Sequence, residues 1–244
     1  MNKQDRYLYL HIPKTGGVSF RQVIENAFHV NEVLHVLNPK EILEHTDDSL
    51  ARYRFVHGHF SAFHVEHLYS FKKITSLRDP VARCLSAYDF WRGLTDSSDW
   101  PENSRAQIRR SKAFSLEELI DFPDWLTSKH FNNHQVRMLR GAVEETAAVT
   151  AEHLAMALKN LESFSFIALN EQLQQSREML CLKFGFFLAS SSVRLNQSSN
   201  RSSVLPELIE KLTVANSLDI QLLQSLRGRG LAAINNIDLS HWGS

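Results

Sequence analysis

The sequence predicts an α/β protein with a P-loop-like, three-layer fold, in which a central parallel sheet is flanked by helices. Short apolar runs alternate along the chain with segments of helical periodicity, which is the pattern of a parallel sheet covered on both faces. Two of these runs pass directly into a turn that opens a helix. The 244 residues, of which 43% are hydrophobic, suffice for one sizeable core, so we expect a single domain over residues 1–244.

The opening unit is a strand, a glycine-containing turn and a helix. Residues 7–12 are predicted as the strand, and residues 13–17 interrupt its pattern. From Ser19 onward, apolar side chains recur at helical spacing. They are Phe20, Val23, Ile24, Ala27 and Phe28.

A second unit of the same kind follows. Residues 55–60 are predicted as a strand that ends in a histidine-rich turn, and residues 73–77 as the next strand. Asp79 and Pro80 come directly afterwards. Asp is a favourable N-cap and Pro suits the first helical position, so we expect a helix to begin here.

The remaining elements alternate in the same way. Residues 95–112 are polar and are expected to form an irregular surface excursion. Helices are expected at 116–126, 136–139, 152–161, from 170 to 180 and over 205–229, with a strand at 164–169 and a serine-rich loop at 190–203.

The composition limits the classes of function. The 27 basic and 27 acidic residues cancel, whereas nucleic-acid-binding proteins usually carry a basic excess, so no nucleic-acid partner is expected. Cys84 and Cys181 lie apart in apolar segments and are expected to be free, buried thiols. Residues 1–6 lack an apolar signal core, and no apolar run is long enough to span a membrane. These features predict a cytoplasmic protein.

The first chemical motif lies in the opening turn, His11-Ile12-Pro13-Lys14-Thr15-Gly16-Gly17-Val18-Ser19-Phe20. Glycines let the backbone approach a ligand closely, and the start of a helix offers unpaired N–H groups to an anion. Lys14 adds a charge. The motif predicts a phosphate or sulfate cradle, although an ordinary turn with an exposed lysine has the same local pattern. It is not a Walker A loop, because the lysine precedes the glycines.

The second motif is Ser76-Leu77-Arg78-Asp79-Pro80-Val81-Ala82-Arg83-Cys84-Leu85-Ser86. Arg78 is expected at a strand end, where a guanidinium can hold a phosphate bidentately, and Ser86 follows two helical turns later. Taken alone, the motif is more typical of a helix cap with Arg78 in a surface ion pair. Together, the two motifs predict two anion sites at the carboxyl edge of one sheet, which is where such sheets bind nucleotides.

This pair of motifs resembles the 5′-phosphosulfate and 3′-phosphate motifs of sulfotransferases, and in particular those of the heparan sulfate and uronyl 2-O-sulfotransferases. The resemblance implies 3′-phosphoadenosine 5′-phosphosulfate (PAPS) as the donor, adenosine 3′,5′-bisphosphate (PAP) as the product, and no required metal. Lys14 would act at the bridging oxygen. The implied donor contacts are Lys14, Thr15, Gly16, Gly17, Ser19 and Phe20 from the first motif and Arg78 and Ser86 from the second.

A third motif, His57-Gly58-His59, is similar to a His-Gly-His segment of the same branch that supplies the catalytic base. A neutral imidazole can take the proton of a weakly nucleophilic sugar hydroxyl. The resemblance implies His59 as the base and His57 as a second catalytic histidine, and the sequence leaves open which of the two is the base. A structural role is the alternative. A metal site is disfavoured, since no acidic or cysteine partner stands at a telling spacing.

Two weaker likenesses complete the site. Residues 133–139 resemble a segment near the acceptor, which implies that Asn133, Gln135 and Arg137 bind substrate, although a polar helix start has the same pattern. The segment around Asn196 and Ser198 resembles a loop that closes over the nucleotide.

The predicted function is transfer of a sulfuryl group from PAPS to a hydroxyl of an acceptor, expected to be a saccharide. The sequence keeps two alternatives open. One is a nucleotide-dependent phosphotransferase, for which a Walker A loop and a clear magnesium-binding acid are missing. The other is a non-catalytic module that binds anionic glycans. The basic stretch Arg105, Arg109, Arg110 and Lys112 would serve that module.

Overall fold

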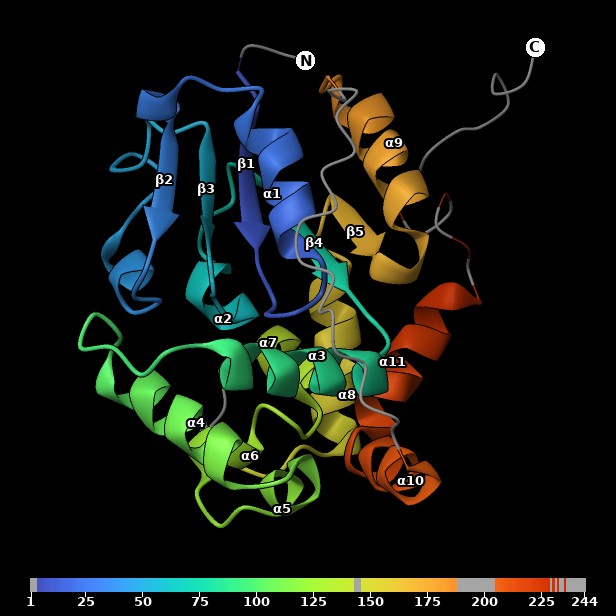
Figure 1. Ribbon diagram of the computed structural model, residues 1–244. Helices are drawn as coiled ribbons and strands as arrows, with labels where there is room; N and C mark the ends of the chain where they lie inside the picture. The colour runs from blue at the N-terminus through green and yellow to red at the C-terminus, as the bar shows by residue number, and fades with distance from the viewer. Residues whose placement is uncertain are drawn as a thin grey trace.

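The computed structural model describes residues 4–142, 146–187, 205–228, 230, 232 and 235. Within these residues, all strands pair in parallel in one sheet of order β2-β3-β1-β4-β5, and their ends point toward α2, α3 and α7 (Figure 1). The strands are β1 (Arg6–Leu10), β2 (Val33–Val36), β3 (Phe55–Gly58), β4 (Phe71–Leu77) and β5 (Phe166–Leu169).

Helices flank this sheet, which confirms the expected α/β architecture. They are α1 (Gly17–Glu25), α2 (Ala62–Val65), α3 (Pro80–Gly93), α4 (Glu102–Ala113), α5 (Leu116–Ile120), α6 (Trp125–Ser128), α7 (His134–Leu139), α8 (Ala151–Leu161), α9 (Leu173–Phe184), α10 (Pro206–Ala215) and α11 (Ser217–Arg227). Short 3₁₀ helices are η1 (Val30–Glu32), η2 (Glu41–Glu44) and η3 (Asn170–Gln172).

The register brings the carboxyl ends of the central strands together. Leu10, the last residue of β1, pairs with Gly58 of β3 on one side and Thr75 of β4 on the other. Residues 7–10 of β1 are all fully buried, because helices cover both faces of the sheet. The polar residues that directly follow these strands therefore lie at one edge of the sheet.

The expected start of α3 is confirmed in detail. Asp79 Oδ1 accepts a hydrogen bond from Ala82 N at 2.9 Å, and Pro80 is the first helical residue. Both cysteines are free thiols, as predicted, but only Cys84 is buried and Cys181 is partly exposed.

Two expectations about the elements are wrong. The edge strand β2 was not predicted, because it is only four residues long and, although three of them are apolar, only Val36 is buried. Residues 95–112 are not an irregular excursion, since their second half forms α4. Its polar sequence concealed a helix that buries only Gln107, Ile108 and Ser111.

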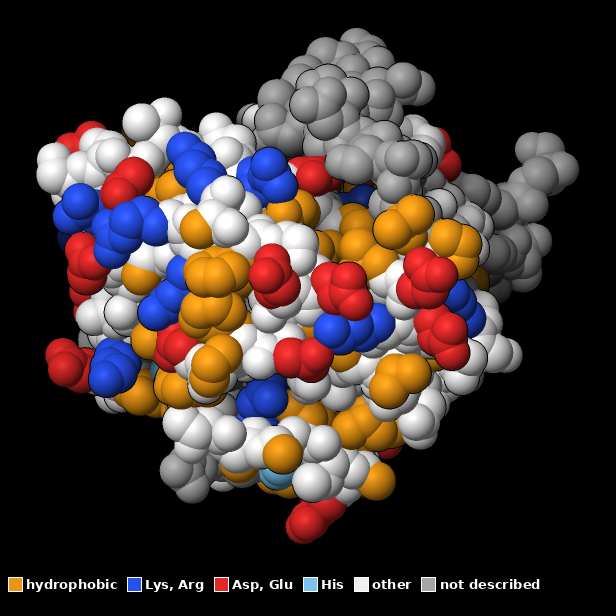
Figure 2. Space-filling model, turned by 60° about the horizontal axis from the view of Figure 1, so that its bottom comes forward, with side chains coloured by type: hydrophobic (Ala, Val, Ile, Leu, Met, Phe, Trp, Pro, Cys, Tyr) orange, Lys and Arg blue, Asp and Glu red, His pale blue; other side chains and the backbone are white. Residues whose placement is uncertain are grey.

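A second apolar cluster joins α3, α5 and α10 at the helical end of the molecule. Its buried residues are Cys84, Ala87, Leu116, Leu119, Ile120, Phe131 and Leu212. Figure 2 views the molecule from this end, and the acidic and basic side chains visible there are interspersed with hydrophobic ones. Among the described helices, none is both long and apolar enough to cross a lipid bilayer.

Candidate active site

The carboxyl edge of the sheet collects polar residues from four strands. Lys14 follows β1, His59 follows β3, Arg78 follows β4 and Asn170 follows β5. The structure joins the two predicted anion motifs directly, because Arg78 Nη1 donates a hydrogen bond to the carbonyl oxygen of Lys14 at 3.1 Å. The two motifs therefore form one continuous site.

The glycines of the first motif shape the start of α1. Gly16 is the N-cap residue with a φ of 83°, a left-handed conformation that favours glycine. At Gly17, a Cβ would lie 2.1 Å from ring atoms of His11 and 2.9 Å from the Tyr9 hydroxyl, so no larger residue fits without displacing them. In the first turn of this nine-residue helix, Ser19 N donates to Gly16 O at 3.1 Å, whereas the N–H groups of the first two helical positions have no intrahelical acceptor and could bind an anion.

Lys14 lies just before α1, in surroundings that disfavour its charged form. Its Nζ lies 4.2 Å from the ring centroid of Phe90, which is 38% exposed. Burial, and then the nearby Arg78, hold the pKa of Lys14 below its ordinary value, although Asp89 opposes this effect. Two cations held close together favour the binding of an anion between them.

The backbone at Lys14 has a φ of 70°, which costs energy for any residue with a Cβ. We expect Lys14→Gly to unfold at a higher denaturant concentration than Lys14→Ala, with a difference of about 1 kcal/mol in the free energy of unfolding. Both variants lose the ammonium group, so they share any change caused by lost charge. Equal midpoints in urea for the two variants would contradict strain at this position.

Two of the predicted donor contacts in this motif point their side chains away from the cradle. The Thr15 hydroxyl is fully buried and bonds Ile12 O and Ser76 Oγ, each at 2.8 Å. Phe20 is fully buried in the core beneath α1. Their side chains hold the turn and the helix against the sheet, so only their backbone atoms remain for a ligand. Ser19, by contrast, is partly exposed in the first turn.

The second motif is fixed by a glutamine from α7. Gln135 Oε1 accepts from Arg78 N at 2.9 Å, and Gln135 Nε2 donates to Arg78 O at 2.8 Å. Ser86 is partly exposed on α3. Arg83 is fully buried and donates to His130 O and to Cys84 Sγ, so its role is structural.

The two histidines of the third motif have different surroundings. His57 is 2% exposed, and its Nε2 lies 3.1 Å from Glu25 Oε1. Its ring is stacked on His35, with centroids 4.4 Å apart. Burial, followed by His35 and Arg21, lowers the pKa of His57 to about 3, so the ring is neutral near pH 7 despite the adjacent carboxylate.

His59 is held in one tautomer. Its Nδ1 lies 2.8 Å from the carbonyl oxygen of His11. A carbonyl oxygen only accepts hydrogen bonds, so Nδ1 carries the proton and Nε2 keeps a lone pair. His59 is exposed at the surface, but the protein atoms around its ring displace water and lower its pKa, which keeps that lone pair unprotonated at neutral pH.

Gly58, between these histidines, allows the turn to form. A Cβ there would lie 2.6 Å from Val36 O and 2.7 Å from the Phe60 ring.

The residues predicted to bind the acceptor are engaged within the protein. Asn133 Oδ1 accepts from Leu218 N and Asp219 N, at 2.9 and 3.1 Å, at the start of α11. Gln135 is fully buried with both amide atoms on Arg78. Arg137 donates to Ala147 O at 2.9 Å, and burial lowers its pKa to about 10. These contacts engage the side chains of Asn133 and Gln135 within the protein, and their contact with substrate stays a prediction.

Asn133 caps α11, and a residue of α11 in turn caps α7. Asp219 of α11 is fully buried and accepts from the backbone N–H groups of Gln135 and Val136, at 3.0 and 2.7 Å. The helices α7 and α11 thus cap one another. Asn196 and Ser198, the remaining predicted donor contacts, lie outside the described residues.

Sequence reasoning missed two residues at this edge. Asn170 reaches Gly16, where a Cβ would lie 3.0 Å from its amide nitrogen, and it directly follows β5 as Lys14 and Arg78 follow their strands. His11 belongs to the first motif, but its ring contact with Gly17 depends on how β1 and α1 meet. Within the described ranges, no group of three or more His, Cys, Asp or Glu side chains could hold a metal ion.

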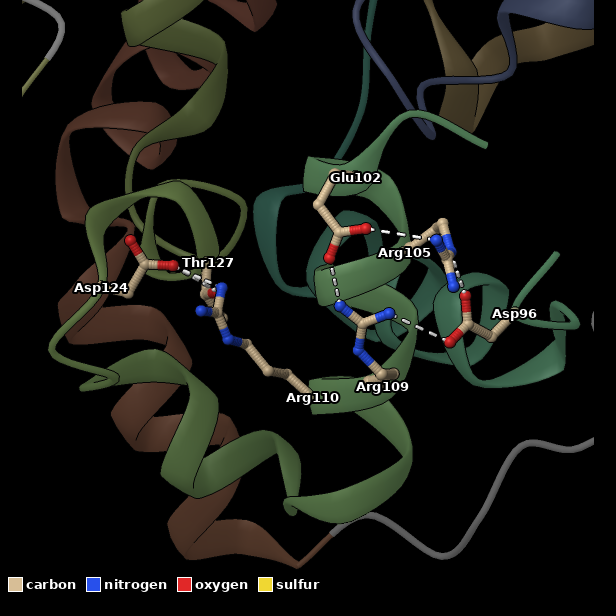
Figure 3. Close-up of polar contacts among 7 residues, drawn as sticks. All are labelled: Asp96, Glu102, Arg105, Arg109, Arg110, Asp124 and Thr127. Atoms are coloured by element: carbon tan, nitrogen blue, oxygen red, sulfur yellow. Dashed lines mark hydrogen bonds and ion pairs between the residues drawn. The ribbon is translucent and has the colours of Figure 1, made fainter. Parts of the chain in front are cut away.

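The basic stretch on α4 is largely neutralised (Figure 3). Asp96 receives Arg105 at 2.8 Å and Arg109 at 3.1 Å, and Glu102 contacts the same two arginines. Arg110 is paired with Asp124 and donates to Thr127 Oγ1 at 2.8 Å. The sequence prediction of an anionic-glycan surface here is therefore not supported, because all three guanidinium groups face carboxylates.

Comparison with known proteins adds the following. A family model described as "Sulfotransferase family" matches residues 1–224. Among solved structures, a sulfotransferase from Alicyclobacillus acidocaldarius matches with a TM-score of 0.49 and 15% sequence identity, over 100% of both chains. No curated protein matches this chain.

Proposed function

Because this chain belongs to the sulfotransferase family, we propose that it moves a sulfuryl group from PAPS to a hydroxyl of a saccharide, with His59 as the base. Membership of this family supports sulfuryl transfer in general. The donor, the acceptor class and the base are our proposals, and so is a single domain over residues 1–244.

The tautomer of His59 is the observation that supports the assignment of the base. Its Nδ1–H is donated to His11 O, which leaves Nε2 to accept the proton of an acceptor hydroxyl. His57 is less suited, since its Nε2 faces Glu25 and its ring is almost fully buried. We assign His57 to positioning the turn that carries His59.

Donor binding is supported by the way the two motifs meet. PAPS carries a phosphosulfate at one end and a phosphate at the other, and the site offers a helix N-terminus with Lys14 beside Arg78. The left-handed Gly16 and the crowded Gly17 let Asn170 and His11 pack directly against the backbone of this turn. We place the phosphosulfate at Lys14, Gly16, Gly17 and Ser19, and the 3′-phosphate at Arg78 and Ser86.

The reaction that we propose is an in-line displacement at sulfur. The acceptor oxygen forms a bond to sulfur while the bond from sulfur to the bridging oxygen breaks. His59 Nε2 takes the acceptor proton. Lys14 and the backbone N–H groups at the start of α1 stabilise the negative charge that grows on the bridging oxygen. PAP then leaves with that oxygen.

The two alternatives lose support for separate reasons. Membership of the sulfotransferase family argues against a phosphotransferase. The glycan-binding module required a basic surface on α4, and its arginines are paired with Asp96, Glu102 and Asp124.

Calorimetric titration with PAP, with ATP and magnesium as the comparison, tests the donor. We expect PAP to bind, and Lys14→Gly and Arg78→Ala to weaken it at least about tenfold each, since each removes a charge-assisted contact. Lys112→Ala, which removes an exposed charge on α4, is the control and should bind PAP normally. Preference for ATP, or no binding of PAP by folded protein, would rule out the proposal.

A further inference from the structure

His11 is fixed between the proposed base and the start of α1. Its N–H donates to Gly58 O at 3.0 Å, and its carbonyl oxygen accepts from His59 Nδ1 at 2.8 Å. Its ring lies between two others, with centroids 5.6 Å from that of Tyr9 and 4.5 Å from that of His59. The imidazole therefore occupies one defined place.

The His11 ring lies against Gly17, the first residue of α1. A Cβ at Gly17 would come within 2.1 Å of both Cδ2 and Nε2 of His11, so this edge of the ring covers the Cα of Gly17. Ser19 N in the first turn donates to Gly16 O, but the N–H groups of Gly17 and Val18 lack intrahelical acceptors and present the positive end of the helix dipole. An anion held by these N–H groups would lie beside Nε2 of His11.

The ring has hydrogen-bonding capacity that the described part of the chain does not use. It is only partly exposed, yet neither ring nitrogen has a hydrogen-bond partner among the described residues. Each ring nitrogen can therefore bond an oxygen atom of a bound ligand. Burial, then His59 and Arg21, hold the pKa of His11 well below its ordinary value, so the ring is neutral and carries a single N–H.

We propose that His11 is a further donor-binding residue, which donates a hydrogen bond from its ring to an oxygen of the phosphosulfate end of the donor. The inference rests on the proposed function, and it assigns to His11 a contact that Thr15 and Phe20 cannot make with their buried side chains. The same residue holds His59 through its carbonyl oxygen. His11 thereby links the position of the bound donor to that of the base.

Calorimetric titration of ring variants with PAP, whose 5′-phosphate takes the place of the phosphosulfate end, tests this role. His11→Phe keeps a ring between Tyr9 and His59 but has no N–H, and we expect its affinity for PAP to fall about tenfold or more. His11→Gln can place an amide N–H near the position of Nε2, and we expect it to keep affinity within about threefold of wild type. His35→Phe is the matched control, because that histidine is exposed and its ring stacks on His57 rather than on His11 or His59.

A second measurement covers the case in which His11→Phe does not fold. In the wild-type protein, nuclear magnetic resonance signals of the His11 ring, identified by their loss in His11→Gln, should shift when PAP is added, and those of His35 should not. Binding of PAP by wild type and His11→Phe with equal affinity, or an unmoved His11 signal at saturation, would overturn the role of His11 alone. Failure of the wild type to bind PAP would overturn the proposed function as well.

Discussion

His59→Ala is expected to lower turnover on a hydroxyl acceptor by a factor of ~10²–10⁴, the usual contribution of a general base, while PAP binds with unchanged affinity. The reason is the locked tautomer, in which Nδ1–H is bonded to His11 O and Nε2 alone can accept the acceptor proton. Transfer from PAPS, measured as PAP release in the presence of acceptor, gives the rate. Calorimetry with PAP gives the affinity.

The neighbouring histidine supplies the control. We expect His57→Gln to affect kcat far less than His59→Ala, because His57 Nε2 faces Glu25 and takes no proton from the acceptor. The pH profile separates the two roles further, since only removal of the base should abolish the acidic limb of the rate profile. A larger loss in His57→Gln than in His59→Ala would reverse our assignment.

The protein is expected to lose stability steeply as the pH falls below about 6.5, the ordinary pKa of histidine. Burial lowers the pKa values of His57 and His130 to about 3, so this pair binds two more protons in the unfolded chain than in the folded protein between these limits. The lowered pKa values of His11 and His134 act in the same direction. The stabilisation by His57 and His130 is complete above pH 6.5 and is lost as the pH falls toward 3. The expected slope is roughly 3 kcal/mol per pH unit for the pair.

Urea unfolding at pH 7.5, 6.5, 5.5 and 4.5 measures this slope. At pH 4.5 the loss would be roughly 5 kcal/mol, which is a large part of the ~5–15 kcal/mol that stabilises a typical domain. His130→Phe should reduce the slope by roughly 1 kcal/mol per pH unit, since it removes one of the two protonation differences. A free energy of unfolding that stays constant from pH 7.5 to 4.5 would contradict burial of these neutral rings.

The fold was largely predictable because its signals are local. The cap Asp79, the following Pro80 and the glycines after β1 mark the two strand–turn–helix units, and both units were found. The edge strand β2 is a run of only four residues, and the helix α4 has no apolar stripe. Their structure depends on pairing with β3 and on contacts of Asp96, neither of which a local pattern contains.

The candidate site was predictable only in part. Lys14, Arg78 and His59 were found because polar residues at strand ends and short motifs mark them. The direction of a buried side chain is set by tertiary packing, so the sequence could not show that Thr15 turns toward Ser76. Nor could it show that the Gln135 amide group would form hydrogen bonds with the backbone of Arg78, a residue 57 positions earlier in the chain.

Because α7 and α11 cap one another, the proposed donor site depends on a helix that the ribosome makes late. Asp219, near the start of α11, fixes the N–H groups of Gln135 and Val136, and Gln135 in turn fixes Arg78. A nascent chain that has emerged only as far as α9 therefore contains every residue of both anion motifs but lacks the residue that holds α7 in place. On the ribosome, the proposed donor site can acquire these hydrogen bonds only after α11 has been made.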